Sequence, residues 1–241
     1  MNYRDPTSPT LDSLIERLQL QLNAHATTAR REWWTKYLRG AASFRGVKMG
    51  DVRKAVHTWY EEERLGEHLS GGQQNELVLM LLEEILPAGT LDWRSDLPRC
   101  ARLFDEGYIR DWSTCDWFCV KVLGPLVEQQ GEACARAISK WREADSVWQR
   151  RASVVAFANL AREGDRNFPG FTEMVLDNCS HLLESQERFA QTSVGWVLRE
   201  LSRSDDGCVI GFVKANLERF SREGLKNATK YLSPEVAERL L

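Results

Sequence analysis

Apolar residues recur every three or four positions along almost the whole of this 241-residue chain. Near the amino terminus, Leu11, Leu14, Ile15 and Leu18 form one such stripe. This spacing is the period of an α-helix that buries one face, whereas the two-residue alternation of a half-buried strand is almost absent. The pattern therefore predicts an all-α protein.

Turn-forming residues divide this pattern into segments of helical length. The breaks include Ser70-Gly-Gly72, Pro87-Ala-Gly89 and Asn167-Phe-Pro-Gly170, and Ser233-Pro234 places a serine at an N-cap and a proline at the first helical position. The pattern predicts helices at about residues 11–23, 27–39, 51–64, 73–86, 95–106, 112–129, 131–143, 146–162, 170–183, 185–203, 206–219, 221–231 and 234–240.

Many short helices with short connections favour an antiparallel stack over a bundle around one axis. Trp112, Trp148 and Trp196 follow one another at intervals of 36 and 48 residues, near the period of HEAT-type helix pairs, although their flanking residues match poorly. We expect a curved, right-handed superhelical stack of antiparallel helix pairs, a HEAT-like α-solenoid. It is expected to form a single domain over residues 11–241, after a disordered tail at residues 1–10.

Composition narrows the classes of protein and of site. Six cysteines contain no Cys-x-x-Cys pair, and no histidine is placed to complete a zinc site, so we expect reduced thiols, no metal and no cofactor. The first ten residues do not resemble a secretion signal, and the longest apolar run, Leu77–Leu82, is too short to span a bilayer. We therefore expect a cytoplasmic protein that makes no membrane contact. We also expect a monomer, although the sequence leaves the oligomeric state open.

The net charge of −3 does not by itself indicate a nucleic-acid partner, but the basic residues are clustered. Arg199 and Arg203 lie one helical turn apart, and Arg222, Lys226 and Lys230 form a stripe with four-residue spacing. Solvated helix surface, balanced by Asp and Glu, is the alternative interpretation. If the clusters share the concave face, they form a track for a phosphate backbone. The candidate DNA-binding residues are Lys48, Arg53, Arg150, Arg199, Arg222 and Lys226.

The segment from Asp111 to Trp117 places an aromatic ring and a carboxylate on one helix face. Trp112 and Asp116 are four residues apart, so both side chains can face one ligand. An indole face and a carboxylate in a partly dry cleft both attract positive charge. The segment therefore predicts a site for a cation, and the alternative is a packed tryptophan beside a surface aspartate.

Five segments together resemble the AlkD family of bacterial DNA glycosylases, which are HEAT-like helical proteins that remove alkylated purines. The resemblance implies a working constellation of a tryptophan and an aspartate one turn apart, a later arginine and a second tryptophan. These positions match Trp112, Asp116, Arg151 and Trp196, with Arg150 as the alternative arginine. The matching segments are Phe44–Arg53, Ile109–Asp116, Val147–Ala152, Gly195–Glu200 and Ser221–Lys226.

The resemblance further implies an activity. The expected substrate is double-stranded DNA carrying cationic N3- or N7-alkylated purines, hydrolysed at the N-glycosidic bond without base flipping and without strand cleavage, by a protein associated with the bacterial nucleoid. Asp116 would stabilise the cationic sugar, Trp112 and Trp196 would pack against it, and Arg151 would hold a phosphate.

Two other functions remain open at this point. One is a non-catalytic helical repeat that binds bent or branched DNA, and the other is a protein–protein scaffold. The preference between N3 and N7 lesions and between small and bulky adducts is also left open.

Overall fold

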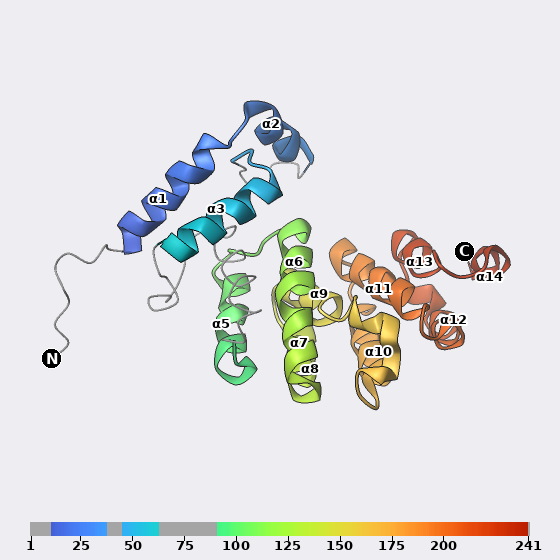
Figure 1. Cartoon of the computed structure of the whole chain (residues 1–241). Helices are drawn as coiled ribbons and strands as arrows, with labels where there is room; N and C mark the ends of the chain where they lie inside the picture. Colours follow the sequence, from blue (N-terminus) through green and yellow to red (C-terminus); the bar gives the residue numbers. More distant parts are fainter. Residues whose placement is uncertain (1–10, 38–44, 63–90, 241) are drawn as a thin grey trace. The chain divides into compact units, whose positions relative to one another are not determined.

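A computed structural model describes residues 11–37, 45–62 and 91–240 of the chain. Within these ranges every regular element is a helix (Figure 1), which confirms the all-α prediction and accords with an α-solenoid. The chain divides into two compact units, Met1–Glu84 and Ile85–Leu241. The single domain predicted over residues 11–241, the tail at residues 1–10 and the right-handed curvature stay predictions. The helix predicted at 73–86 lies outside the described residues.

The first unit is built from three described helices. Leu18 and Leu22 on α1 are buried, as are Val56 and Trp59 on α3, and α1 packs against α3. These apolar faces are the ones that the three- and four-residue spacing of the sequence predicted. The helices are α1 (Leu11–Ala24), α2 (Thr28–Tyr37) and α3 (Met49–Glu62).

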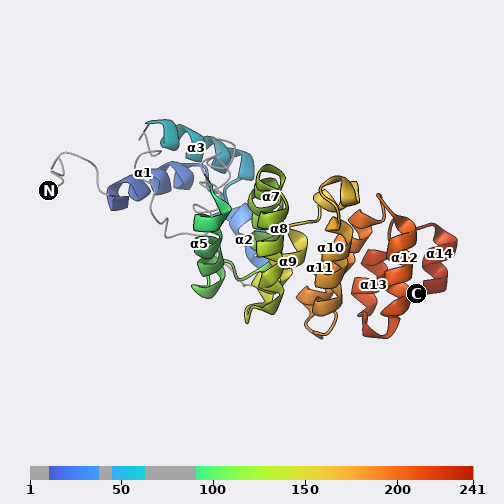
Figure 2. The same ribbon diagram turned by 90° about the horizontal axis from the view of Figure 1, so that it is seen from below.

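In the second unit the helices follow one another in chain order, coloured green to red in Figures 1 and 2. Each helix buries an apolar face against its neighbours, so that the core runs along the unit. The helices are α5 (Trp93–Asp105), α6 (Trp112–Phe118), α7 (Gly124–Gln130), α8 (Glu132–Ser139), α9 (Val147–Val155), α10 (Phe171–Leu182), α11 (Arg188–Leu201), α12 (Asp206–Ala215), α13 (Arg222–Ala228) and α14 (Pro234–Leu240).

Helices α6 and α7 form one continuous helix, as predicted, but a π-helical turn at Cys119–Leu123 joins them. In this turn the Gly124 amide donates to the Cys119 carbonyl, five residues back. Pro125 follows immediately, and a proline ring cannot fit a regular helical register because it clashes with the carbonyl four residues back and has no amide donor. The wider turn therefore accommodates Pro125 while α6 keeps its direction.

The helix predicted at 131–143 ends at Ser139 and is followed by a 3₁₀ turn at Lys140–Glu143, and two further predicted helices also end earlier than the periodicity indicated. The helix predicted at 146–162 stops at Val155, where the Phe157 and Ala158 amides donate to carbonyls three residues back and tighten the backbone, and a 3₁₀ segment follows at Leu160–Arg166. The helix predicted at 206–219 ends at Ala215, followed by a 3₁₀ turn at Leu217–Arg219. Apolar spacing continues through both breaks, which is why it did not reveal them.

Helix α11 is the most deeply packed element of the second unit, and it lies unusually close to α13. A Cβ atom added at Gly195 would lie 2.4 Å from the Gly224 carbonyl oxygen, and one added at Gly224 would lie 2.9 Å from the Gln191 carbonyl oxygen. Only glycine permits this approach, since real Cβ contacts are longer. Gly195 and Gly224 therefore fix the position of α11, which also carries Trp196.

The cysteines and the turn at Ser233-Pro234 agree with expectation. All six cysteines are free thiols. Helix α14 begins at Pro234, and the Ser233 hydroxyl accepts a long hydrogen bond of 3.4 Å from the Val236 amide. None of the described helices is both long enough and apolar enough to cross a lipid bilayer.

Candidate active site

A carboxylate and a guanidinium from two neighbouring helices meet at the centre of the candidate site. Arg151 on α9 donates from Nε to Oδ1 of Asp116 on α6 at 2.6 Å, and from Nη2 to Oδ2 at 2.9 Å. This bidentate geometry is the strongest form of a charge-assisted hydrogen bond between two side chains. The Arg151 side chain is 5% exposed and that of Asp116 is 14% exposed, so water screens the pair only weakly.

The third nitrogen of Arg151 fixes the guanidinium to α11. Nη1 donates to the Phe189 carbonyl at 2.8 Å and to the Thr192 hydroxyl at 3.1 Å. All three nitrogens of the guanidinium are therefore engaged, and one side chain joins α6, α9 and α11. The orientation of the Asp116 carboxylate is thereby set by three helices rather than by its own rotamer.

Burial and charge act in opposite directions on Asp116. Burial raises the pKa of its carboxyl above the ordinary value, and the hydrogen bonds and positive charge of Arg151 oppose that rise without cancelling it. The charge of Asp111 raises the pKa further. For Arg151, burial alone lowers the pKa, but the hydrogen bonds and charge of Asp116 outweigh it, and the pKa lies above its ordinary value.

Asp111 determines where α6 begins. Its Oδ1 accepts a hydrogen bond from the Thr114 amide at 3.0 Å and so caps the helix. The residue is 2% exposed, and its Oδ2 has no hydrogen-bond partner among the described residues. The charge of Asp111 therefore adds to that of Asp116, which favours a positive charge beside Asp116.

The two predicted tryptophans lie on two of the three helices that Arg151 joins. Trp112 is half-buried at the first position of α6, four residues from Asp116 on the same helix face. Trp196 is half-buried on α11, four residues beyond Thr192, which contacts Arg151. The roles of both tryptophans in a site stay predictions.

Arg150 and Arg151 differ in what they contact. Arg150 donates to the carbonyls of Ala144 and Asp145 at 2.8 and 2.7 Å and pairs with Glu187. It therefore holds the segment before α9 and makes none of the contacts that Arg151 makes with Asp116. Of the two candidates left open by the sequence, the geometry favours Arg151 as the partner of the carboxylate.

The candidate DNA-binding residues are spread over both units. Lys48 is exposed, and Arg53 is half-buried on α3 of the first unit. In the second unit, Arg222 and Lys226 are exposed one turn apart on α13. Arg199 is 19% exposed and contacts Glu200 and Asn227. These placements leave their role in DNA binding a prediction.

Two residues near the site, Phe189 and Thr192, were not predicted from the sequence. Phe189 and Thr192, which accept from Arg151, precede Trp196 by seven and four residues, so they share its face of α11. That spacing was the available signal. The Trp148 ring lies 4.7 Å from the Phe189 ring and packs α9 against α11. Among the described residues, no group of three or more His, Cys, Asp or Glu side chains is placed to hold a metal ion.

Comparison with known proteins places this chain in a family. The family model described as "DNA alkylation repair enzyme" matches residues 18–232. A solved structure described as "Predicted DNA alkylation repair enzyme from Enterococcus faecalis" has the same fold, with a TM-score of 0.67 and 15% identity over 87% of this chain and 98% of that chain. No curated protein matches the chain. The family resemblance indicated by the motifs is confirmed, and the chain belongs to the family of DNA alkylation repair enzymes.

Proposed function

We propose that this protein is a DNA glycosylase that hydrolyses the N-glycosidic bond of cationic N3- or N7-alkylated purines in double-stranded DNA. The observation that carries the proposal is the buried, bidentate pair of Asp116 and Arg151, which holds a carboxylate in one orientation. Membership of a DNA alkylation repair family supplies the context of damaged DNA.

The chemistry requires an anion at a fixed place. An alkylated purine that carries positive charge is already a good leaving group, so the difficult part is the sugar, which becomes an oxocarbenium-like cation as the bond breaks. A preorganised carboxylate stabilises this cation more than it stabilises the neutral ground-state sugar, and the barrier falls. Asp116 is assigned this role, and it also orients the attacking water, as carboxylates do in glycoside hydrolysis.

The surroundings of Asp116 favour a cationic ligand. Asp111 adds a second carboxyl group close enough to raise the pKa of Asp116, and only Arg151 pairs with Asp116 among the described residues. The half-buried ring of Trp112 lies on the same helix face and attracts positive charge through its π electrons. Trp196 is assigned the same function from α11.

Arg151 is proposed to position Asp116. From the sequence, Arg151 was expected to bind a phosphate. The residue is 4% exposed, however, and all three nitrogens of its guanidinium already donate to Asp116, Phe189 and Thr192. A buried guanidinium with these contacts acts on the reaction through the carboxylate. As the family resemblance implies, we propose simple hydrolysis, without strand cleavage and with the base left in the DNA stack.

The direct test is the release of bases from methylated duplex DNA by the purified protein, identified by mass spectrometry. We expect 7-methylguanine and 3-methyladenine as free bases and abasic sites in otherwise intact strands. Comparing 7-methylguanine with a bulky N3-adenine adduct then measures how open the site is. No release of any cationic lesion would overturn the proposal.

One observation favours a second candidate, a DNA-binding repeat without catalysis. Both oxygens of Asp116 are engaged by Arg151, which is also the geometry of an ion pair that only joins helices. The two functions differ in one result. A protein that binds duplex DNA tightly and releases no base, with or without Asp116, would be the binding module.

A further inference from the structure

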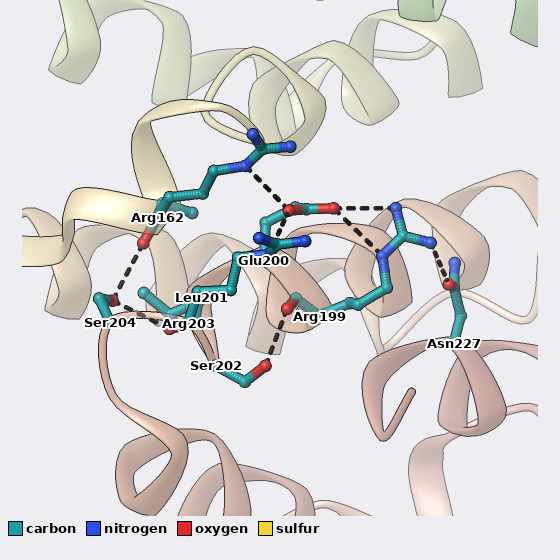
Figure 3. Close-up of polar contacts among 9 residues, drawn as sticks. Arg162, Arg199, Glu200, Leu201, Ser202, Arg203, Ser204 and Asn227 are labelled. Carbon is teal, nitrogen blue, oxygen red and sulfur yellow. Dashed lines mark hydrogen bonds and ion pairs between the residues drawn. The ribbon is translucent and has the colours of Figure 1, made fainter. Parts of the chain in front are cut away.

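A second, separate cluster of charged side chains surrounds Glu200 on α11. The Glu200 side chain is 3% exposed, and three arginines point toward its carboxylate (Figure 3). Arg162 donates from Nε to Oε2 at 3.0 Å, and Arg203 Nε lies 3.3 Å from the same oxygen. Arg199 donates from Nε and Nη2 to Oε1 at 3.2 and 3.0 Å.

The cluster carries an excess of positive charge. One carboxylate neutralises one of the three guanidinium groups, which leaves two positive charges in a small volume. Within the described ranges, Glu163 pairs with Arg166, Asp165 accepts from the Thr172 amide and Asp205 caps α12, and none of these carboxylates pairs with the three arginines. Guanidinium groups held this close repel one another, and an anion on their solvent side relieves that repulsion.

The three arginines differ in exposure, because Arg199 is largely buried whereas Arg162 and Arg203 are about half exposed. Arg199 is 19% exposed, and its Nη1 donates to Asn227 at 2.9 Å, so it holds Glu200 against α13. Arg162 and Arg203 are each 47% exposed. Arg162 is seen to donate through Nε, so its Nη groups are directed away from Glu200 in Figure 3. The guanidinium of Arg203 lies 4.5 Å from the centre of the Tyr231 ring, which fixes its plane.

The cluster and the candidate active site share one face of α11. Thr192, which contacts Arg151, is seven residues before Arg199, and this interval returns to the same helix face. Arg203 lies two residues beyond the end of α11 at Leu201. At a rise of about 1.5 Å per residue, Thr192 and Arg199 are separated by roughly 10 Å along the helix.

We propose that Arg162 and Arg203 together hold one phosphodiester of the duplex backbone. Glu200 and Arg199 position the two guanidinium groups, whose exposed forks match a phosphate bidentately. The inference rests on the proposed function only in taking duplex DNA as the ligand. Its test needs no excision of a base.

The experiment is a salt titration of binding to an undamaged, fluorescein-labelled duplex, followed by anisotropy. The combined substitution Arg162→Ala and Arg203→Ala is compared with Arg102→Ala and Arg136→Ala. The control removes the same charge from two exposed arginines that are each paired one to one, with Glu106 and Glu132. We expect the first pair to reduce the slope of log K against log salt by about 1 relative to the control. The combination of Arg162→Lys and Arg203→Lys keeps the charge and should retain the slope while weakening affinity.

Equal slopes for the two alanine pairs would overturn the inference, and thermal unfolding shows that both pairs are folded at the temperature of the titration. If the unaltered protein releases no base but the slope still falls only for Arg162 and Arg203, the proposed function fails and the phosphate site stands. If the unaltered protein releases bases but the two alanine pairs give equal slopes, the proposed function stands and the phosphate site fails. Absence of any measurable duplex binding by the unaltered protein would overturn both.

Discussion

Asp116 and Arg151 are 35 residues apart in the chain, and Arg151 Nε lies 2.6 Å from Asp116 Oδ1 in a buried bidentate pair. Removing one partner leaves the other charge buried without compensation, which costs about 3–5 kcal/mol in comparable pairs. We expect Arg151→Ala to lower the free energy of unfolding by roughly this amount, measured by urea denaturation.

The matched control for that measurement is Arg102→Ala, which breaks the exposed pair of Arg102 and Glu106. Exposed pairs contribute about 0–1 kcal/mol, so the control should lie close to the unaltered protein. Similar losses for the two variants would mean that the buried pair does not stabilise the arrangement of α6, α9 and α11.

The close approach of α11 and α13 predicts a large difference between two glycines in helices. Gly195→Ala places a methyl group 2.4 Å from the Gly224 carbonyl oxygen, so the helices must separate, and overpacking of this kind costs about 1–3 kcal/mol. Gly211 on α12 has nothing within 4 Å of an added Cβ. There, alanine should be neutral or stabilise by up to about 1 kcal/mol, because it restricts the unfolded chain. Thermal unfolding of the two variants compares them directly, and an equal effect would contradict the close approach.

The acidity of Asp116 predicts the pH dependence of base release. The carboxylate acts as an anion, and burial raises its pKa above the ordinary value of 3.8. Protonation therefore begins at a higher pH than for an exposed aspartate, and the rate should fall as the pH drops through this raised pKa and stay level above it. Single-turnover rates, corrected for spontaneous depurination, give the midpoint. A rate that stays level down to pH 3.8 would contradict the assignment.

The cysteines predict a simple pattern of chemical modification. Cys208 is partly exposed and the other five thiols are buried. Burial raises the pKa of Cys100 and of Cys134 to about 12, and it also raises the pKa of Cys179. With Ellman's reagent at mildly alkaline pH, one thiol should react in the folded protein and all six after denaturation. Replacing Cys208 by serine should remove the first reaction, and rapid modification of further thiols would show that the second unit opens readily.

The sequence predicts helices well where packing follows one regular face. It located α11, α13 and α14 closely, and it treated α6 and α7 as one helix because the apolar stripe continues through the π-helical turn. The break after Val155 was missed for the same reason, since the residues on both sides of it are buried. Periodicity reports which face is apolar, and it does not report where the backbone tightens.

For the candidate site, the four-residue spacing within one helix was sufficient to pair Trp112 with Asp116. Spacing along the chain does not show which residues of two different helices come into contact. Arg150 and Arg151 differ by about 100° around α9, and which of them meets Asp116 depends on the face that α9 turns toward α6. Glu200 was overlooked because a glutamate next to an arginine on a helix resembles solvated surface. Its side chain is 3% exposed and contacts Arg162, which lies 38 residues earlier in the chain, and spacing within one helix does not reveal such a contact.

If the Asp116 carboxylate drives base release, its loss must stop the reaction without loosening the complex with DNA. Single-turnover release of 7-methylguanine is measured for the unaltered protein, for Asp116→Asn and for Asp105→Asn, which removes an exposed carboxylate from α5. Duplex affinity is measured for all three. We expect Asp116→Asn to abolish release while duplex affinity stays within about threefold, and Asp105→Asn to change neither. Release by Asp116→Asn at the rate of the unaltered protein would contradict this role of the carboxylate.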